Sequence, residues 1–158
     1  MYWLMKSEPN EYSIDDLYND KEQTEFWDGV RNYQVRNMMR DQMKVDELAF
    51  FYHSSCQQPG IVGIVKIAKA AAPDPTAFDP ENKHYDPKSE KSNPRWFGVT
   101  VKFVEKFNKI IPLERIRDLH AFSQSQLVRK GNRLSIVPII EQQWQAIMEL
   151  PDIHNTSK

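Results

Sequence analysis

The sequence has only one cysteine and five glycines among its 158 residues. A lone Cys56 excludes an internal disulfide and a zinc site built from several cysteines. No apolar run approaches the ~18–20 residues that a membrane-spanning helix needs, and no basic segment followed by an apolar one precedes the first regular pattern. We therefore expect a protein of a reducing intracellular compartment that has no membrane partner.

Motifs of several common enzyme classes are also missing. The few glycines form no phosphate-binding loop, and no Gly-x-Ser-x-Gly elbow marks a serine hydrolase. The four histidines lack the His-Glu-x-x-His spacing of a zinc protease, so we expect no metal site and no cofactor. His53 and Cys56 are close enough in sequence to suggest a base and its nucleophile. Because such a pair needs a third, orienting group, an ordinary strand-end histidine is the better interpretation.

The chain has no excess charge of either sign, since 21 Lys and Arg stand against 22 Asp and Glu. A protein that holds nucleic acid mainly through phosphates is usually strongly basic. The charges are nevertheless unevenly spread: residues 1–28 carry a net −6, whereas residues 31–44 and 129–133 each carry +3. The two basic segments suit contacts with a few phosphates. On charge alone, a solvated helix face and cations at a helix C-terminus are the better explanation of both segments.

Short runs rich in β-branched and aromatic residues predict strands at 2–7, 48–53, 61–68, 97–107 and 134–140. Capping residues and apolar spacing predict short helices from Ser13 and from Leu113, and others at 32–43, 123–130 and 141–150. Strands dominate the middle of the chain without regular strand–helix alternation. We therefore expect an α+β fold, with a mostly antiparallel sheet or small barrel and helices at its edges.

The segment 73–94 contains five prolines and is too long and too aromatic for a plain linker. Segments of this kind in compact domains are either functional or disordered. Because prolines reduce the entropy lost on ordering, we expect an ordered loop. The length of the chain favours a single domain over residues 1–150, followed by a frayed tail at 151–158.

Aromatic residues gather in the first third of the chain, where residues 1–52 hold 10 of the 18 Phe, Trp and Tyr. A planar base needs an aromatic face and a few directed donors and acceptors, and Trp27 and Asn32 supply both within six residues. The structural alternative is that Trp27 fills the core and Asn32 caps the next helix. A cap and a ligand contact can coexist, since helix N-termini also attract anions.

Seven motifs in chain order carry a family resemblance. They are MKSEP at 5–9, WDGVRNYQ at 27–34, FYHS at 51–54, PGIVGI at 59–64, YDPKS at 85–89, PRW at 94–96 and RLS at 133–135. Together they resemble the EVE domain family from residue 2 to about residue 140. The resemblance implies a PUA-like fold, a mixed β-barrel with flanking helices, and kinship with YTH and ASCH domains.

Such domains hold a nucleobase, often a modified one, in a pocket. The resemblance therefore implies a non-enzymatic module that binds a modified base in DNA or RNA, in the cytoplasm or, in a eukaryote, the nucleus. The expected base pocket comprises Lys6, Ser7, Glu8, Trp27, Val30, Asn32, Tyr52, His53 and Ser54. The expected phosphate contacts are Arg31, Arg36, Lys130 and Arg133. Two alternatives remain: an enzyme that uses Glu8 or His53 as acid or base, and a protein whose cleft binds a peptide.

Overall fold

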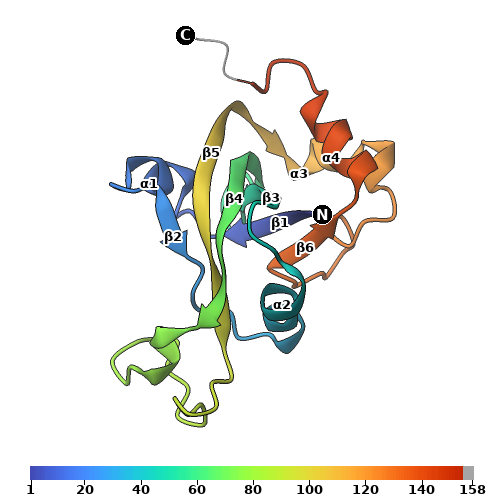
Figure 1. Ribbon diagram of the computed structural model, residues 1–158. Coiled ribbons are helices and arrows are strands. Elements are labelled where there is room, and N and C mark those ends of the chain that lie inside the picture. Colours follow the sequence, from blue (N-terminus) through green and yellow to red (C-terminus); the bar gives the residue numbers. More distant parts are fainter. Residues whose placement is uncertain (155–158) are drawn as a thin grey trace.

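The computed structural model describes residues 1–154 and is built around one six-stranded sheet (Figure 1). The strand order is β2-β5-β4-β3-β1-β6. The strands are β1 (Tyr2–Ser7), β2 (Thr24–Phe26), β3 (Leu48–His53), β4 (Gly60–Pro73), β5 (Phe97–Pro112) and β6 (Ile136–Ile139). Strands and short helices together confirm the α+β class.

One strand pair departs from the expected antiparallel pattern. β1 runs parallel to β3, with Met5 beside Phe51, and antiparallel to β6, with Met5 beside Ile136. The short strand β2 was not predicted from the sequence. It pairs with β5 through Glu25 opposite Val101 and forms one edge of the sheet.

The helices are short, and they are α1 (Ile14–Asn19), α2 (Tyr33–Asn37), α3 (Leu113–Arg117) and α4 (Glu141–Met148). A π-helical turn, η1 (Met38–Gln42), extends α2, and two 3-10 turns are η2 (Pro75–Phe78) and η3 (His120–Phe122). The predicted capping box of α1 is present, since the Ser13 hydroxyl accepts from the Asp16 amide and the Asp16 carboxylate accepts from the Ser13 amide. Within residues 1–154 no helix combines the length and apolar composition needed to cross a bilayer.

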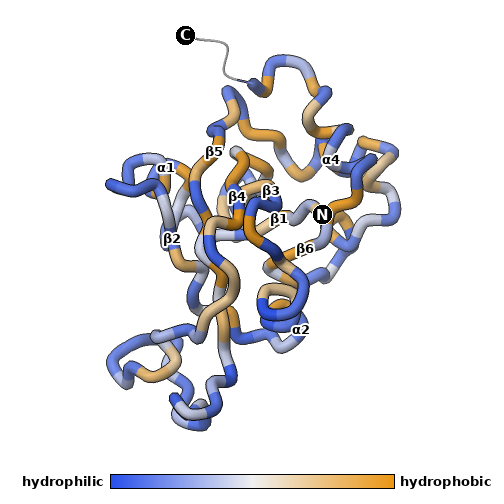
Figure 2. Tube along the Cα trace, viewed as in Figure 1, coloured by the Kyte–Doolittle hydropathy of each residue, from blue (hydrophilic) through white to orange (hydrophobic). Residues whose placement is uncertain are grey.

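The sheet separates two apolar cores, because successive side chains of a strand point to opposite faces. In β3, Ala49 and Phe51 join the core with Trp3 and Trp27, whereas Phe50 joins the core with α4. Apolar residues accordingly follow the strands, while the long β4–β5 connection is mostly polar (Figure 2). Each strand therefore contributes to two environments, and only one of them borders the cleft described below.

Two sequence predictions fail near the C-terminus. Residues 123–130 form turns instead of a helix, with the Ser125 hydroxyl accepting from the Leu127 amide, and Leu127 is buried. Residues 151–154 are not frayed, because Ile153 is 1% exposed and its carbonyl accepts from the Asn108 amide at 2.6 Å. The rest of the predicted tail, 155–158, lies outside the described residues.

Candidate functional site

A cleft of about 1050 Å³ opens where the end of β1 meets the chain that follows β2. Segments far apart in the sequence line it: the β1 end, residues 25–32, the turn after β3, the loop at 81–84 and residues 132–135. Among the predicted pocket residues the cleft brings together Lys6, Ser7, Glu8, Trp27, Val30, Asn32 and Ser54. Convergence of distant polar groups and an aromatic ring in one hollow is typical of a ligand site.

Trp27 forms part of the wall and part of the core. Its amide donates to the Val99 carbonyl at 2.8 Å, which extends the β2–β5 ladder by one residue. The indole packs edge-on against Phe51, with ring centroids 5.7 Å apart, and only 8% of the residue is exposed. The ring is therefore held rigidly beside the cleft.

Asn32 serves as the predicted helix cap while its amide group stays at the cleft. Its Oδ1 accepts from the Val35 amide at 3.0 Å at the start of α2, which satisfies one of the helix's unpaired donors. The side chain is exposed and lines the cleft. Its NH₂ group can therefore donate to a bound molecule.

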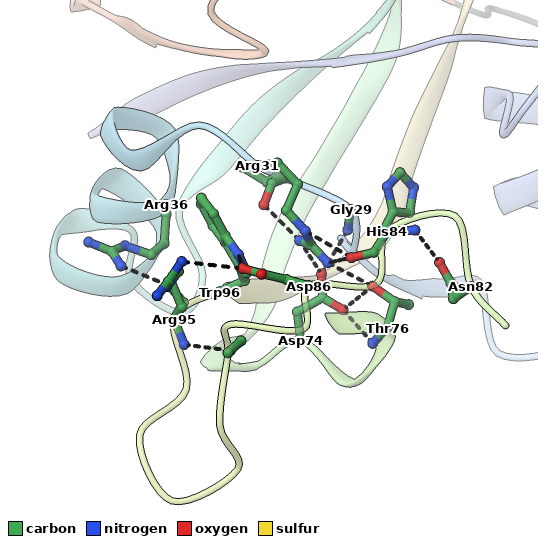
Figure 3. A network of polar contacts seen from close by, with 12 residues as sticks. Gly29, Arg31, Arg36, Asp74, Thr76, Asn82, His84, Asp86, Arg95 and Trp96 are labelled. Carbon is green, nitrogen blue, oxygen red and sulfur yellow. Dashed lines mark hydrogen bonds and ion pairs between the residues drawn. The ribbon is translucent and has the colours of Figure 1, made fainter. Parts of the chain in front are cut away.

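The loop at 81–84 is fixed across the cleft by a buried carboxylate (Figure 3). Asp74 is 0% exposed, and its Oδ2 accepts from the Gly29 amide at 2.8 Å and from Arg31 Nη1 at 3.0 Å. Its Oδ1 accepts from the amide and hydroxyl of Thr76. Burial alone would raise the pKa of Asp74, but the hydrogen bonds from Thr76, Gly29 and Arg31 outweigh it and lower that pKa.

Gly29 is required where this loop crosses the chain. Its φ of +76° is a conformation that other residues rarely adopt, and a Cβ there would lie 2.5 Å from Nε2 of His84. The close approach lets the His84 imidazole cover the turn that follows Trp27. The YDPKS segment is tied down as well, since Trp96 Nε1 donates to Asp86 Oδ2 at 2.7 Å.

Arg31 and Arg36 do not have the geometry expected of phosphate contacts. All five N–H groups of Arg31 donate within the protein, to Asp74, Thr76, the Val30 carbonyl and twice to the His84 carbonyl. No donor remains for a phosphate, so its role is to hold the loop.

Arg36 lies outside the cleft, against the loop rather than toward a ligand. It donates to the Arg95 carbonyl at 2.8 Å and to Asn37, and its guanidinium lies over the ring of Tyr33. Tyr33 in turn stacks on Trp96 with 4.7 Å between centroids. Of the other predicted phosphate contacts, Arg133 lines the cleft and is exposed, whereas Lys130 does not line it.

Tyr52 and His53 do not line the cleft either. Tyr52 is 3% exposed in the core on the other face of the sheet, as strand alternation from Phe51 requires. Nε2 of His53 accepts from the Ile14 amide at 3.1 Å, and burial lowers the pKa of the imidazole. His53 therefore fixes the start of α1, and this geometry does not support it as an acid or base in the cleft.

Two cleft residues that the sequence analysis missed are Glu25 and Asp28, which flank Trp27. Burial, followed by the charge of Asp28, raises the pKa of Glu25. Burial, followed by the charge of Asp74, raises the pKa of Asp28. Their position on either side of the predicted stacking residue was a signal in the sequence.

Lys6 and Ser7 stand at the end of β1, on the rim of the cleft. The Lys6 side chain is partly buried, with Nζ 5.9 Å from the ring centroid of Tyr52, and burial lowers its pKa. The Ser7 hydroxyl donates to the Tyr12 carbonyl, and the Ser7 carbonyl accepts from the Ser54 amide at 3.0 Å. Across residues 1–154 no three histidine, cysteine or acidic side chains are grouped to hold a metal ion.

Comparisons with known proteins place this geometry in a family. The chain is 43% identical to thymocyte nuclear protein 1 of Mus musculus, over 96% of this chain and 74% of the relative. It superposes on a crystal structure of a Pseudomonas syringae protein with a TM-score of 0.88 and 46% identity, covering 94% and 97% of the two chains.

A further solved structure contains a ligand. It is human THYN1 protein in complex with 5-methylcytosine-containing DNA, with a TM-score of 0.84 and 42% identity over 93% of this chain and 95% of that one. The model of the EVE domain matches residues 1–150. The chain therefore belongs to the EVE domain family.

Proposed function

We propose that this protein binds DNA that contains a modified base and holds that base in the cleft beside Trp27. The observation that carries the proposal is the cleft itself, in which a rigid indole and several polar groups border about 1050 Å³. The complex of the 42% identical human THYN1 protein with 5-methylcytosine-containing DNA supports it. We infer the same class of ligand for this chain.

A base stacked inside a duplex cannot enter the cleft, so the target nucleotide must turn out of the stack. The Trp27 ring would then offer a stacking surface worth ~1–3 kcal/mol. The Asn32 amide, Ser54 and the backbone at Lys6 and Ser7 would supply directed hydrogen bonds. The volume is at the upper end for small-molecule pockets, which leaves room for the attached sugar.

Phosphate contacts are few in this proposal. Arg133 is the exposed guanidinium at the cleft among the predicted phosphate contacts, while Lys130 stays a prediction. A net charge of −1 argues against a broad phosphate footprint. Binding should therefore depend on salt only weakly and on the presented base strongly.

We propose a binding module without turnover, because His53 is engaged by α1 and, within residues 1–154, the Glu8 side chain forms no ion pair that would activate it. RNA as a ligand, and the cytoplasm or the nucleus as the compartment, stay predictions.

The deciding experiment titrates the protein against fluorescent DNA and RNA oligonucleotides that differ in one central base, including cytosine and 5-methylcytosine. We expect one modified base to be bound at least ten-fold more tightly than its parent. Equal affinity for every modified and unmodified oligonucleotide would overturn the proposal.

A further inference from the structure

The two carboxyl groups beside Trp27 have no structural role comparable to that of Asp74. Within residues 1–154 neither Glu25 nor Asp28 forms an ion pair, in contrast to Glu11, Asp15, Asp41 and Asp74. Both line the cleft, and burial raises the pKa of both. Glu25 is half-buried, and a half-buried carboxylate without a cation is costly to the fold, so a use in binding would account for it. Asp28 is exposed at the cleft and accessible to a ligand.

Their placement around Trp27 follows from the strand. Glu25 and Trp27 are two residues apart in an extended segment, so both side chains point to the same side of β2. Asp28 begins the turn that Gly29 completes. Glu25 precedes Trp27 in the chain and Asp28 follows it, and both line the cleft. A base that stacks on the Trp27 indole would therefore have a carboxyl group on either side.

We propose that Glu25 and Asp28 select a pyrimidine with an amino group on its Watson–Crick edge, namely cytosine and its 5-substituted forms, over a pyrimidine with an oxo group there, such as thymine. This inference rests on the proposed function, since it assigns the residues that read the base in the same cleft. It adds which hydrogen-bonding groups of the base are recognised, and it names Glu25 and Asp28 as the residues that recognise them.

The hydrogen-bonding groups on the Watson–Crick edges of cytosine and thymine explain this preference. Cytosine presents an N4 amino donor beside the N3 acceptor, and carboxylates accept well from N4. Thymine reverses both groups, with an O4 acceptor beside an N3–H donor. A carboxylate that accepts from N4 of cytosine would face O4 of thymine, and two acceptors cannot bond. A base whose oxygen is left unpaired in this way is rejected.

The N3 acceptor of cytosine needs a donor, which a protonated carboxyl group supplies. Glu25 suits this role because its charged neighbours are acids: Asp28 beside it, Asp20, and Asp16 on α1. Strand β5 places the uncharged Val101 opposite it.

Asp28 suits the role of the ionised acceptor. The positive charges of His84 and Arg31 partly offset the effects of burial and of Asp74 on its pKa. Lys6, Lys83 and Arg133 also line the cleft, and Lys83 is paired with Glu11. In this arrangement Glu25 takes up a proton from solvent when cytosine binds, so affinity should fall as the pH rises.

The test uses single-stranded oligonucleotides that are identical except for one central 5-methylcytosine or thymine. Both bases carry the 5-methyl group, and single strands remove the different costs of opening the two base pairs. The wild type should prefer 5-methylcytosine by about ten- to a hundred-fold, the discrimination of a well-paired base edge. Its affinity should fall between pH 5 and pH 8.

Two isosteric variants separate the roles. Asp28→Asn can present either an oxygen or an NH₂ group, so the preference should fall to within a few-fold of one. Glu25→Gln carries a permanent donor, so the pH dependence should flatten while 5-methylcytosine still binds. Glu90→Gln removes the same charge from an exposed residue that does not line the cleft and should match the wild type in both respects. None of the three variants should melt at a lower temperature than the wild type.

The outcomes distinguish this inference from the proposed function. If the wild type prefers 5-methylcytosine but both variants keep its preference and its pH dependence, this inference is wrong and the binding module stands. If the wild type prefers thymine or binds the two equally, the selection is also wrong. If the wild type binds no oligonucleotide at all, the proposed function fails and this inference with it.

Discussion

Replacing Asp74 with asparagine tests whether the buried carboxylate holds the cleft together. The substitution keeps the shape of the side chain but turns one acceptor oxygen into an NH₂ group. The Thr76 amide and hydroxyl can still donate to the remaining oxygen. The Gly29 amide and the Arg31 guanidinium, which now donate at 2.8 and 3.0 Å, would face another donor.

The expected cost follows from these contacts. Breaking a buried ion pair by removing one partner costs ~3–5 kcal/mol, and the Arg31 side chain is 23% exposed, which favours the lower value. We therefore expect ~3 kcal/mol of destabilisation. For a chain of this length that corresponds to a fall of ~6–12 °C in melting temperature.

Calorimetry measures the melting shift, and amide hydrogen exchange shows where the structure opens. Residues 81–86 should exchange faster in Asp74→Asn, because the Arg31 guanidinium that holds the His84 carbonyl loses its counter-ion. Glu90→Gln, at an exposed position of the same loop, should change stability by less than ~0.5 kcal/mol. A loss below ~1 kcal/mol in Asp74→Asn, with unchanged exchange at 81–86, would refute this account of the loop.

Four further outcomes are expected. Trp27→Leu keeps an apolar side chain in the core but removes the flat ring, so binding of the preferred oligonucleotide should weaken by ~1–3 kcal/mol. If an anisotropy titration shows that the folded variant binds with unchanged affinity, the base does not stack on Trp27. Arg133→Gln should lower the slope of log K against log salt by about one unit for every sequence alike, and an unchanged slope would exclude a phosphate contact. Burial raises the pKa of Glu25 in the folded chain, so the ionised form of Glu25 destabilises the fold at pH 7. Glu25→Gln should therefore melt at a higher temperature than the wild type at pH 7, and this gain should fade as the pH falls toward ~4.3. Equal melting temperatures at pH 7 would contradict the raised pKa. The hydrogen bond that the His154 imidazole donates to the Glu105 carboxylate raises the pKa of His154. Its contribution to stability is therefore full below pH ~6.5 and is lost as the pH rises through the higher folded pKa. Titration by NMR should show this raised value, and Glu105→Gln should reduce it.

Much of the fold could be predicted because its signals are local. Strand β1, strand β3 and the caps at Ser13 and Asn32 depend on residues adjacent in sequence, and the structure confirms them. β2 was missed because three residues give too short a pattern, and only pairing with distant β5 makes it a strand. The parallel pairing of β1 with β3 depends on tertiary packing in the same way.

The site was harder to predict because it depends on which face a residue occupies. The FYHS motif suggested that Tyr52 and His53 act together, yet alternation sends neighbouring side chains to opposite faces of the sheet. The basic residue Arg31 was assigned to phosphates, because nothing in the sequence reveals that Asp74 lies beside it. Charge and spacing identify candidates, but the contacts of each side chain decide its role.

The position of β1 in the sheet has a consequence for biosynthesis. β1 precedes the other strands of the domain in sequence but lies between β3 and β6, and its β6 partners span residues 136–139. It therefore cannot be paired on both sides until β6 has been synthesised. Folds dominated by such distant contacts form slowly and expose strand edges meanwhile. Because Lys6 and Ser7 stand on this strand, a nascent chain should acquire its cleft only after β6 has been synthesised.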